Sequence, residues 1–96
     1  MSAPLIGLVA HTGKAGALAM AGRLRDEFQK QGAEVRVEQK TAAMIGSGEG
    51  EPTRVLAEEC EILVALGGDG TILQVVHEMG DVFKPIFGIN LGSRCR

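Results

Sequence analysis

The chain has 96 residues and a formal net charge of −2, with 45% hydrophobic and 23% charged residues. This length suits one domain, and this balance is typical of a globular chain rather than a disordered one. The small net charge excludes a general field that would attract nucleic acid or an anionic membrane. Any phosphate binding must therefore come from local geometry.

No segment indicates export or a membrane. Residues 1–4 lack a basic stretch followed by an apolar one, so we predict no signal peptide. No apolar run approaches the ~20 residues that a membrane helix needs. The chain has two cysteines, Cys60 and Cys95, which could form one disulfide. A chain with so few cysteines fits reduced thiols better. We therefore expect a cytoplasmic protein with neither a membrane nor a nucleic-acid partner.

The hydrophobic pattern changes period along the chain. Short apolar or alternating runs, typical of strands, lie at residues 5–10, 34–38, 62–66 and 85–89. Apolar residues three or four apart, typical of helices, lie at residues 17–31 and 71–79, and residues 53–59 suit a short helix. Residues 40–52 contain three glycines and are expected to form a mobile loop.

This order of elements predicts an α/β fold: a Rossmann-like, three-layer domain with a parallel sheet of about four strands. Ligands of such sheets bind beyond the carboxyl ends of the strands. The loops expected there are residues 11–16, 67–71 and 90–93, and all three contain glycine. We expect the functional site at these loops.

The turn Gly67-Gly68-Asp69-Gly70-Thr71 joins the most apolar predicted strand to a predicted helix. Its glycines allow positive φ, and the first amides of the helix lack partners, so the turn suits a phosphate. The Asp69 carboxylate would repel a phosphate, but it makes sense if it accepts a proton from a substrate hydroxyl or helps to hold Mg²⁺. Both roles belong to phosphoryl transfer. The alternative, a plain helix cap at Asp69 or Thr71, is disfavoured by the apolar strand and helix on either side.

Two motifs resemble those of one enzyme family. Leu66-Gly67-Gly68-Asp69-Gly70-Thr71-Ile72-Leu73 resembles the signature of the NAD kinases, with related turns in 6-phosphofructokinases and in diacylglycerol and sphingosine kinases. Pro85-Ile86-Phe87-Gly88-Ile89-Asn90-Leu91-Gly92 resembles a strand that is typical of the NAD kinases and not of those other groups. Residues 7–14 also resemble the first strand and loop of that family. The resemblance makes residues 1–92 a partial N-terminal nucleotide-binding domain and leaves residues 93–96 as a divergent tail.

The resemblance implies an activity and a set of roles. The family transfers a phosphoryl group from ATP or polyphosphate, with Mg²⁺ or another divalent metal, to the 2′-hydroxyl of the adenosine ribose of NAD. Asp69 would be the base that takes the hydroxyl proton. Gly70 would contact the dinucleotide through its backbone, Leu73 would line the adenosine pocket, and Gln74 would reach the nucleotide. The phosphate donor's site would be shaped by Gly67, Gly68 and Thr71, with Asn90 and Gly92 in the neighbouring loop.

The resemblance stops after Gly92. NAD kinases continue there into a Gly-Phe-Leu stretch that helps to hold adenine, whereas this chain has Ser93-Arg94-Cys95-Arg96. The family's C-terminal β-rich domain, with an Asn-Glu pair that contacts NAD, is also lacking. We therefore expect a truncated product that is inactive by itself and forms homo-oligomers through uncovered apolar surface. The alternatives are a lipid or sugar-phosphate kinase of the same superfamily, and an inert or self-associating nucleotide-binding remnant.

Three other polar residues are weaker candidates. Lys14 lies between glycines but lacks the spacing of a phosphate loop, so a solvated loop lysine is favoured over a contact with the donor. His11 is expected to be structural, and His77 to lie on the surface.

Overall fold

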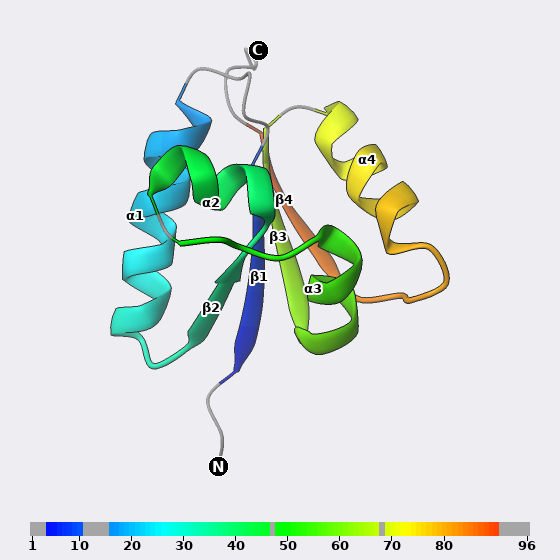
Figure 1. Ribbon diagram of the computed structural model, residues 1–96, viewed down its shortest axis with the longest axis horizontal. Helices are drawn as coiled ribbons and strands as arrows, with labels where there is room; N and C mark the ends of the chain where they lie inside the picture. The colour runs from blue at the N-terminus through cyan, green and yellow to red at the C-terminus, as the bar shows by residue number, and fades with distance from the viewer. Residues whose placement is uncertain (1–3, 11–15, 47, 68, 91–96) are drawn as a thin grey trace.

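The computed structural model describes residues 4–10, 16–46, 48–67 and 69–90, with Asp69 and Asn90 described by their backbones alone (Figure 1). The elements are β1 (Leu5–Ala10), α1 (Ala17–Lys30), β2 (Glu34–Val37), α2 (Gln39–Ile45), α3 (Thr53–Glu59), β3 (Ile62–Gly67), α4 (Asp69–Met79) and β4 (Ile86–Asn90). Among the described residues, no helix combines the length and the apolar character that crossing a membrane requires.

The four strands form one parallel sheet in the order β2-β1-β3-β4. The central strands β1 and β3 are almost wholly apolar because both of their faces are covered. In β2, charged residues alternate with valines, which suits a strand nearer the edge. The predicted α/β fold with a parallel sheet of about four strands is confirmed.

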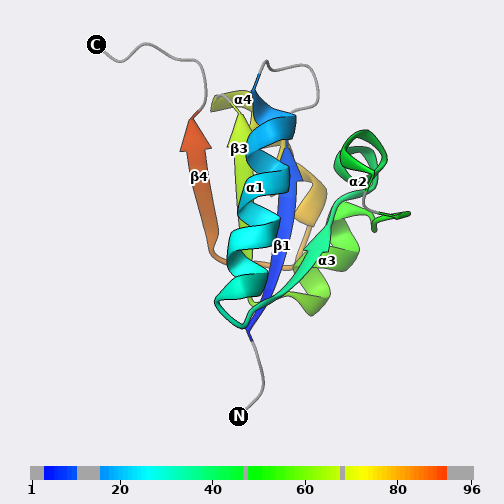
Figure 2. The same ribbon diagram turned by 90° about the vertical axis from the view of Figure 1, so that its left-hand side faces the viewer.

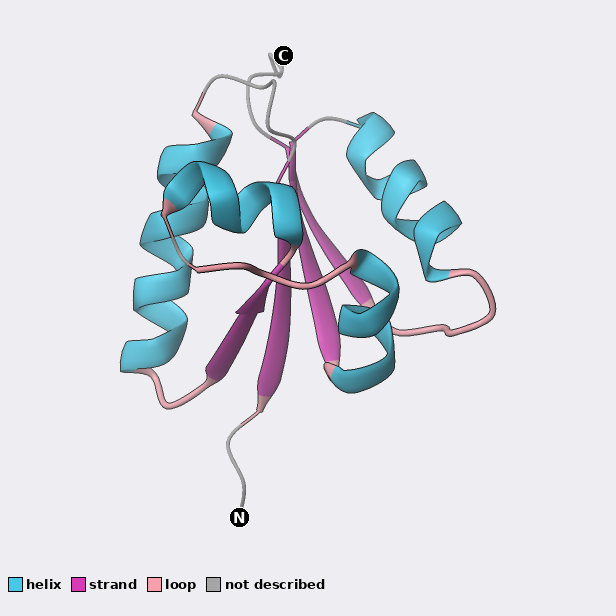
Figure 3. Ribbon diagram, in the orientation of Figure 1, coloured by secondary structure: helices cyan, strands magenta, loops and turns pink. Residues whose placement is uncertain are grey.

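Helices cover both faces of the sheet. Figure 3 shows α1 on one side, with α3 and α4 on the other. Leu8, Val64 and Leu66 pack in the core on the α1 side, where α2 also contributes Ala42. The alternate residues Val9, Leu63 and Ala65 pack on the other side, with α3 and α4, because successive strand residues point to opposite faces. The three-layer arrangement is thus confirmed.

Exposed apolar surface is found at the β4 end of the sheet. Phe87 pairs in register with Val64, so it lies on the α1 side, and its exposed fraction is 59%. Figure 2 shows the reason, since β4 lies at the edge of the sheet, beyond the reach of α1. Further exposed apolar side chains lie elsewhere among the described residues: Met44 on α2, Leu73 and Val76 on α4, and Phe83 in the loop after α4.

A glycine in β1 sets how closely α3 approaches the sheet. A Cβ atom at Gly7 would lie 2.5 Å from Cδ2 of Leu63 and 3.2 Å from Sγ of Cys60. It would also lie 3.3 Å from Cβ of Leu56, a residue of α3. Gly7 is therefore required for close packing between α3 and the sheet.

The expectation of a mobile loop over residues 40–52 is wrong for its first half, which forms α2. The Glu38 carboxylate accepts hydrogen bonds from the backbone amides of Lys40, at 2.9 Å, and Thr41, at 3.1 Å, and so caps the start of the helix. Thr41 is buried, and Gly46 ends the helix with φ of 70°. The sequence reading missed α2 because it gave weight to the glycines, the first of which marks the end of a helix.

The bounds of two further helices can be compared with the predictions. Residues 53–59 form the short helix α3, as predicted, whereas α4 begins at Asp69, two residues earlier than the apolar pattern indicated. Glu51, within the expected loop, extends the sheet locally: its amide donates to the carbonyl of Val37, at 2.9 Å, and its carbonyl accepts from the amide of Gln39, at 3.0 Å. Residues 50–52 are thereby tied to the end of β2.

Candidate functional site

The Gly-rich turn is tight. β3 ends at Gly67, and α4 begins only two residues later, at Asp69. Gly67 has φ of 149°, a value that L side chains rarely adopt, so glycine is required at this end of β3. Gly67 also pairs in register with Asn90, the last residue of β4. The backbone therefore brings two of the predicted site residues side by side at the carboxyl edge of the sheet.

A cleft of about 590 Å³ lies beside this turn, within the range of ligand pockets. Its floor is formed by Val9 and Ala10 at the end of β1, and its walls by α4 and by the segments that begin α2 and α3. The cleft is lined by Val9, Ala10, Glu38, Gln39, Lys40, Pro52, Thr53, Arg54, Thr71, Gln74, Val75, His77 and Glu78.

Thr71 is the most informative residue of this cleft. Its exposed fraction is 5%, yet its Oγ1 atom has no hydrogen-bond partner among the described residues. A buried hydroxyl without a partner costs about 1–3 kcal/mol. Thr71 also lies in the first turn of α4, at the positive end of the helix dipole. An unpaired donor in this place suits an anionic ligand in the cleft.

The structure separates the predicted site residues of α4. Gln74 lines the cleft with Thr71, and its amide Nε2 donates to the Glu78 carboxylate at 3.1 Å. Leu73 is not part of the cleft lining and is 71% exposed. Gly70 is exposed, and a Cβ atom added to it would meet nothing within 4 Å.

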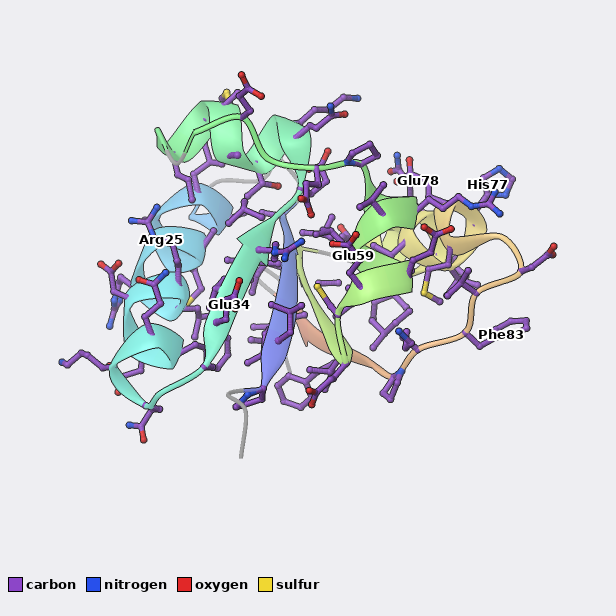
Figure 4. All side chains as sticks on the ribbon, turned by 60° about the horizontal axis from the view of Figure 1, so that its bottom comes forward. Arg25, Glu34, Glu59, His77, Glu78 and Phe83 are labelled. Carbon is purple, nitrogen blue, oxygen red and sulfur yellow. The ribbon has the colours of Figure 1, made fainter. Side chains whose placement is uncertain are left out.

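Several predicted residues lie outside the described parts of the chain: Gly68 and Gly92, as well as the weaker candidates His11 and Lys14. Asn90 is placed by its backbone only. His77 is exposed at the rim of the cleft, in keeping with the surface position predicted for it. Figure 4 shows His77 and Glu78 on α4, while Phe83 projects from the loop that follows this helix.

Two cationic residues of the cleft were not predicted as site residues, Lys40 and Arg54. Lys40 was assigned to a mobile loop, and Arg54 belongs to the first turn of α3. No spacing in the sequence indicates either residue, because the cap that starts α2, Glu38, is an uncommon one. Once α2 forms, Lys40 is held beside the end of β1 instead of in a free loop.

The start of α2 is fixed to the sheet by one side chain. The Thr41 hydroxyl accepts a hydrogen bond from the amide of Ala10, at 3.0 Å, and lies 2.9 Å from a carboxylate oxygen of Glu38, to which it donates. These bonds join the end of β1 to the helix that carries Lys40. One wall of the cleft is therefore held rigidly to its floor.

The remaining polar groups of this face do not form a metal centre. Among the residues that the structure describes, no group of three or more His, Cys, Asp or Glu side chains could hold a metal ion. Cys60 is fully buried behind α3, and burial raises its pKa to about 11, so it is a neutral thiol at neutral pH. A reactive or metal-binding role for Cys60 is disfavoured.

Comparison with known proteins adds independent information. Residues 6–95 match the family profile described as "ATP-NAD kinase N-terminal domain". An NAD kinase of Halorubrum lacusprofundi is 42% identical over 89 residues, which cover 92% of this chain and 31% of that protein. An NAD kinase of Thermococcus kodakarensis is 38% identical over 88 residues, or 91% of this chain and 31% of that protein. For an NAD kinase of Brucella suis the identity is 54% over 39 residues. The chain thus spans less than a third of the length of these relatives.

Proposed function

Because this chain belongs to the NAD kinase family, we propose that it supplies part of a site that phosphorylates the 2′-hydroxyl of the adenosine ribose of NAD to give NADP. The observation that supports this most directly is the Thr71 hydroxyl, buried and unpaired in a cleft beside the Gly-rich turn. Such a group suits the phosphates of a donor, ATP or polyphosphate. The relatives named above favour NAD over a lipid or a sugar phosphate as the acceptor.

In this proposal Asp69 accepts the proton of the ribose hydroxyl as its oxygen attacks the terminal phosphorus of the donor. The bond to the leaving phosphate breaks, and the phosphoryl group moves to the ribose. Gly70 and Leu73 face the dinucleotide, together with Asn90 and Gly92 in the neighbouring loop. The site of the phosphate donor is shaped by Gly67, Gly68 and Thr71, and the Gln74 side chain reaches the nucleotide.

A divalent metal fits this site as a companion of the donor. Mg²⁺ is commonly bound by one or two carboxylates together with substrate phosphates, and it neutralises charge on the phosphates. In this proposal the phosphates of the donor hold the ion, and Asp69 contacts it at most indirectly.

The 96-residue chain by itself should be inactive. Phosphoryl transfer depends on positioning both substrates, and the relatives are more than three times as long as the segment that matches. Leu73, which the resemblance assigns to the adenosine pocket, is 71% exposed. We place the protein in the cytoplasm, and homo-oligomerisation stays a prediction of the sequence.

The test is a chimera in which residues 6–90 replace the matching segment of the Halorubrum lacusprofundi NAD kinase. We expect it to form NADP from NAD and ATP, and Asp69→Asn to lower the rate by roughly 10²–10⁴-fold, the usual worth of a general base. Asp81→Asn, at an exposed carboxylate after α4, is the matched control and should leave the rate unchanged.

Three results would count against the proposal. One is a chimera that folds, as judged by circular dichroism, yet forms no NADP. Another is an Asp69→Asn chimera as active as its parent. The third is robust NADP formation by the 96-residue chain alone, which would contradict its predicted inactivity.

A further inference from the structure

β4 forms one edge of the sheet and lacks the features that protect an edge strand from a second chain. Among the described residues β4 pairs only with β3, so its other side carries unpaired backbone groups. Its residues, Ile86–Asn90, include no charged residue and no proline, which are the residues that commonly keep an edge strand from pairing with another chain. This edge is therefore able to accept a further strand.

The opposite edge of the sheet, β2, is protected. It contains the charged residues Glu34 and Arg36, and Arg36 donates to the carboxylates of Glu51 and Glu59. The backbone of Glu51 is also bonded beside the end of this strand. The contrast between the two edges indicates that β4 is the one that takes a partner.

Apolar side chains flank β4 on both faces of the sheet. Phe87 is exposed on the α1 side. On the other side α4 reaches over the strand, because a Cβ atom added to Gly88 would collide with Cδ1 of Ile72. Leu73 and Val76 lie beside Ile72 on α4 and are exposed. Only another apolar element can cover this surface, which continues around the edge from one face to the other.

The hydrogen bonds between β3 and β4 fix which backbone groups of β4 point outward. The amide of Leu63 donates to the carbonyl of Pro85, at 2.9 Å, so the backbone groups of Pro85 point at β3. In a parallel ladder only every second residue of a strand bonds to a given neighbour. The amides and carbonyls of Ile86 and Gly88 therefore point away from the sheet, towards any strand that is added.

A second copy of the chain fits this edge through a two-fold axis at Gly88. Antiparallel pairing about the axis sets Gly88 opposite Gly88 of the second copy and Ile86 opposite Asn90, in pairs that exchange both hydrogen bonds. Phe87 then lies opposite Ile89 in a closely spaced pair, and the axis repeats this contact. None of the paired residues is charged, so no like charges meet across the axis.

From these observations we propose that the 96-residue chain forms a two-fold dimer in which the β4 strands pair antiparallel and join the two sheets into one. The two α4 helices then lie on the same face of the joined sheet, with the flanks that carry Leu73 and Val76 turned towards each other. Such an interface is small beside the ~1,200–2,000 Å² of stable complexes, so we expect a dissociation constant of roughly 10–100 μM. On dilution below this range the chain is a monomer, and Leu73 and Phe87 are exposed to water.

Sedimentation equilibrium of the purified 96-residue chain, from well below to well above the expected dissociation constant, tests the proposal. We expect a monomer that gives way to a dimer and to nothing larger. Phe87→Lys should raise the dissociation constant by roughly tenfold or more, because it sets a charge in the middle of an apolar edge. Met44→Lys is the matched control, at an exposed apolar residue of α2, which lies on the opposite side of the molecule from β4 (Figure 2). It should dimerise as the parent does.

A mixture of two variants separates loss of the interface from loss of the fold. The Phe87 positions of the two copies are diagonal neighbours on one face of the joined sheet, ~7–8 Å apart. Phe87→Lys and Phe87→Glu should each be monomeric, whereas their mixture should form a mixed dimer, because opposite charges then meet across the axis. Native mass spectrometry distinguishes the mixed dimer by its mass.

A parent chain that stays monomeric at every concentration would overturn the inference, and would leave the β4 edge to a different chain or to residues outside the described ranges. So would assemblies larger than a dimer, or a mixture of the two Phe87 variants that remains monomeric. Association that Met44→Lys weakens as much as Phe87→Lys does would assign the contact to another surface and refute the pairing of β4. No nucleotide is present in these measurements, so their failure leaves the proposed function standing.

Discussion

α4 has two unlike sides, one on each flank of its buried stripe. One side, with Thr71, Gln74 and Glu78, is polar and forms a wall of the cleft. The other side, with Leu73 and Val76, is apolar, and these two side chains are 71% and 44% exposed. Between the two sides, Val75 and Met79 are buried in the core.

Both sides are incomplete, but in different ways. The cleft side has one polar atom, Oγ1 of Thr71, that lacks a hydrogen-bond partner among the described residues. The apolar side has hydrocarbon in water, which only further apolar surface can cover. The comparison shows that α2 and α3 enclose the polar side of α4, whereas the side that carries Leu73 and Val76 is left open.

The largest expected effect tests which residues of α4 belong to the core. Met79→Ala should lower the free energy of unfolding by about 2–5 kcal/mol, because Met79 is 2% exposed and its removal leaves a cavity. Leu73→Ala, an equally drastic truncation on the apolar side, should change it by less than about 0.5 kcal/mol. Urea denaturation followed by circular dichroism measures both. Equal losses would show that Leu73 is covered in solution and would remove the distinction between the two sides.

A smaller change in the free energy of unfolding, with opposite signs in two variants, tests the cleft side of α4. Thr71→Val replaces an unpaired buried hydroxyl by a methyl group and should raise the free energy of unfolding by about 1 kcal/mol. Thr41→Val is the matched control: it removes a hydroxyl bonded to Ala10 and Glu38 and should lower the free energy of unfolding by about 1–2 kcal/mol. The same urea titration serves. A loss of stability in Thr71→Val would mean that its hydroxyl is already satisfied within the protein.

The smallest effect is confined to alkaline pH and concerns Cys60, buried under α3 on the same face of the sheet as the cleft. Burial raises its pKa from 9.0 to about 11 in the folded chain. Because folding favours the neutral thiol, this contribution to stability is present below pH 9.0 and is lost as the pH rises towards about 11. The difference in unfolding free energy between the parent and Cys60→Ala should therefore shrink over that range. A constant difference would mean that water reaches Cys60 through the cleft side.

Most of the fold could be predicted because its signals are local. The apolar runs of β1 and β3 and the helical spacing in α1 depend on neighbouring residues, and they imply a parallel sheet. α2 was missed because its cap, Glu38, is an uncommon N-cap and its buried Thr41 binds a residue 31 positions earlier. That contact exists only in the folded chain.

In the candidate site, too, local sequence signals could be recognised, whereas residues brought in by tertiary packing could not. The turn around Gly67 was recognised from consecutive residues, and the structure places it at the carboxyl edge of the sheet. Lys40 and Arg54 reach the cleft only through tertiary packing of α2 and α3, so no spacing in the sequence indicates them. The exposure of Leu73 was also beyond sequence reasoning, because it depends on which side of α4 meets the sheet.

The bond between Thr41 and Ala10 has a consequence for the order in which parts of the molecule gain and lose structure. A helix of seven residues does not persist by itself in water, so α2 depends on its tertiary contacts, among them the bond to the end of β1 and the packing of Ala42 in the core. Any event that moves Ala10, such as the arrival of a ligand above the sheet, is transmitted directly to the segment that carries Lys40. α2 is thus a dependent element, and its melting should be the first sign that the strand end beneath it has shifted.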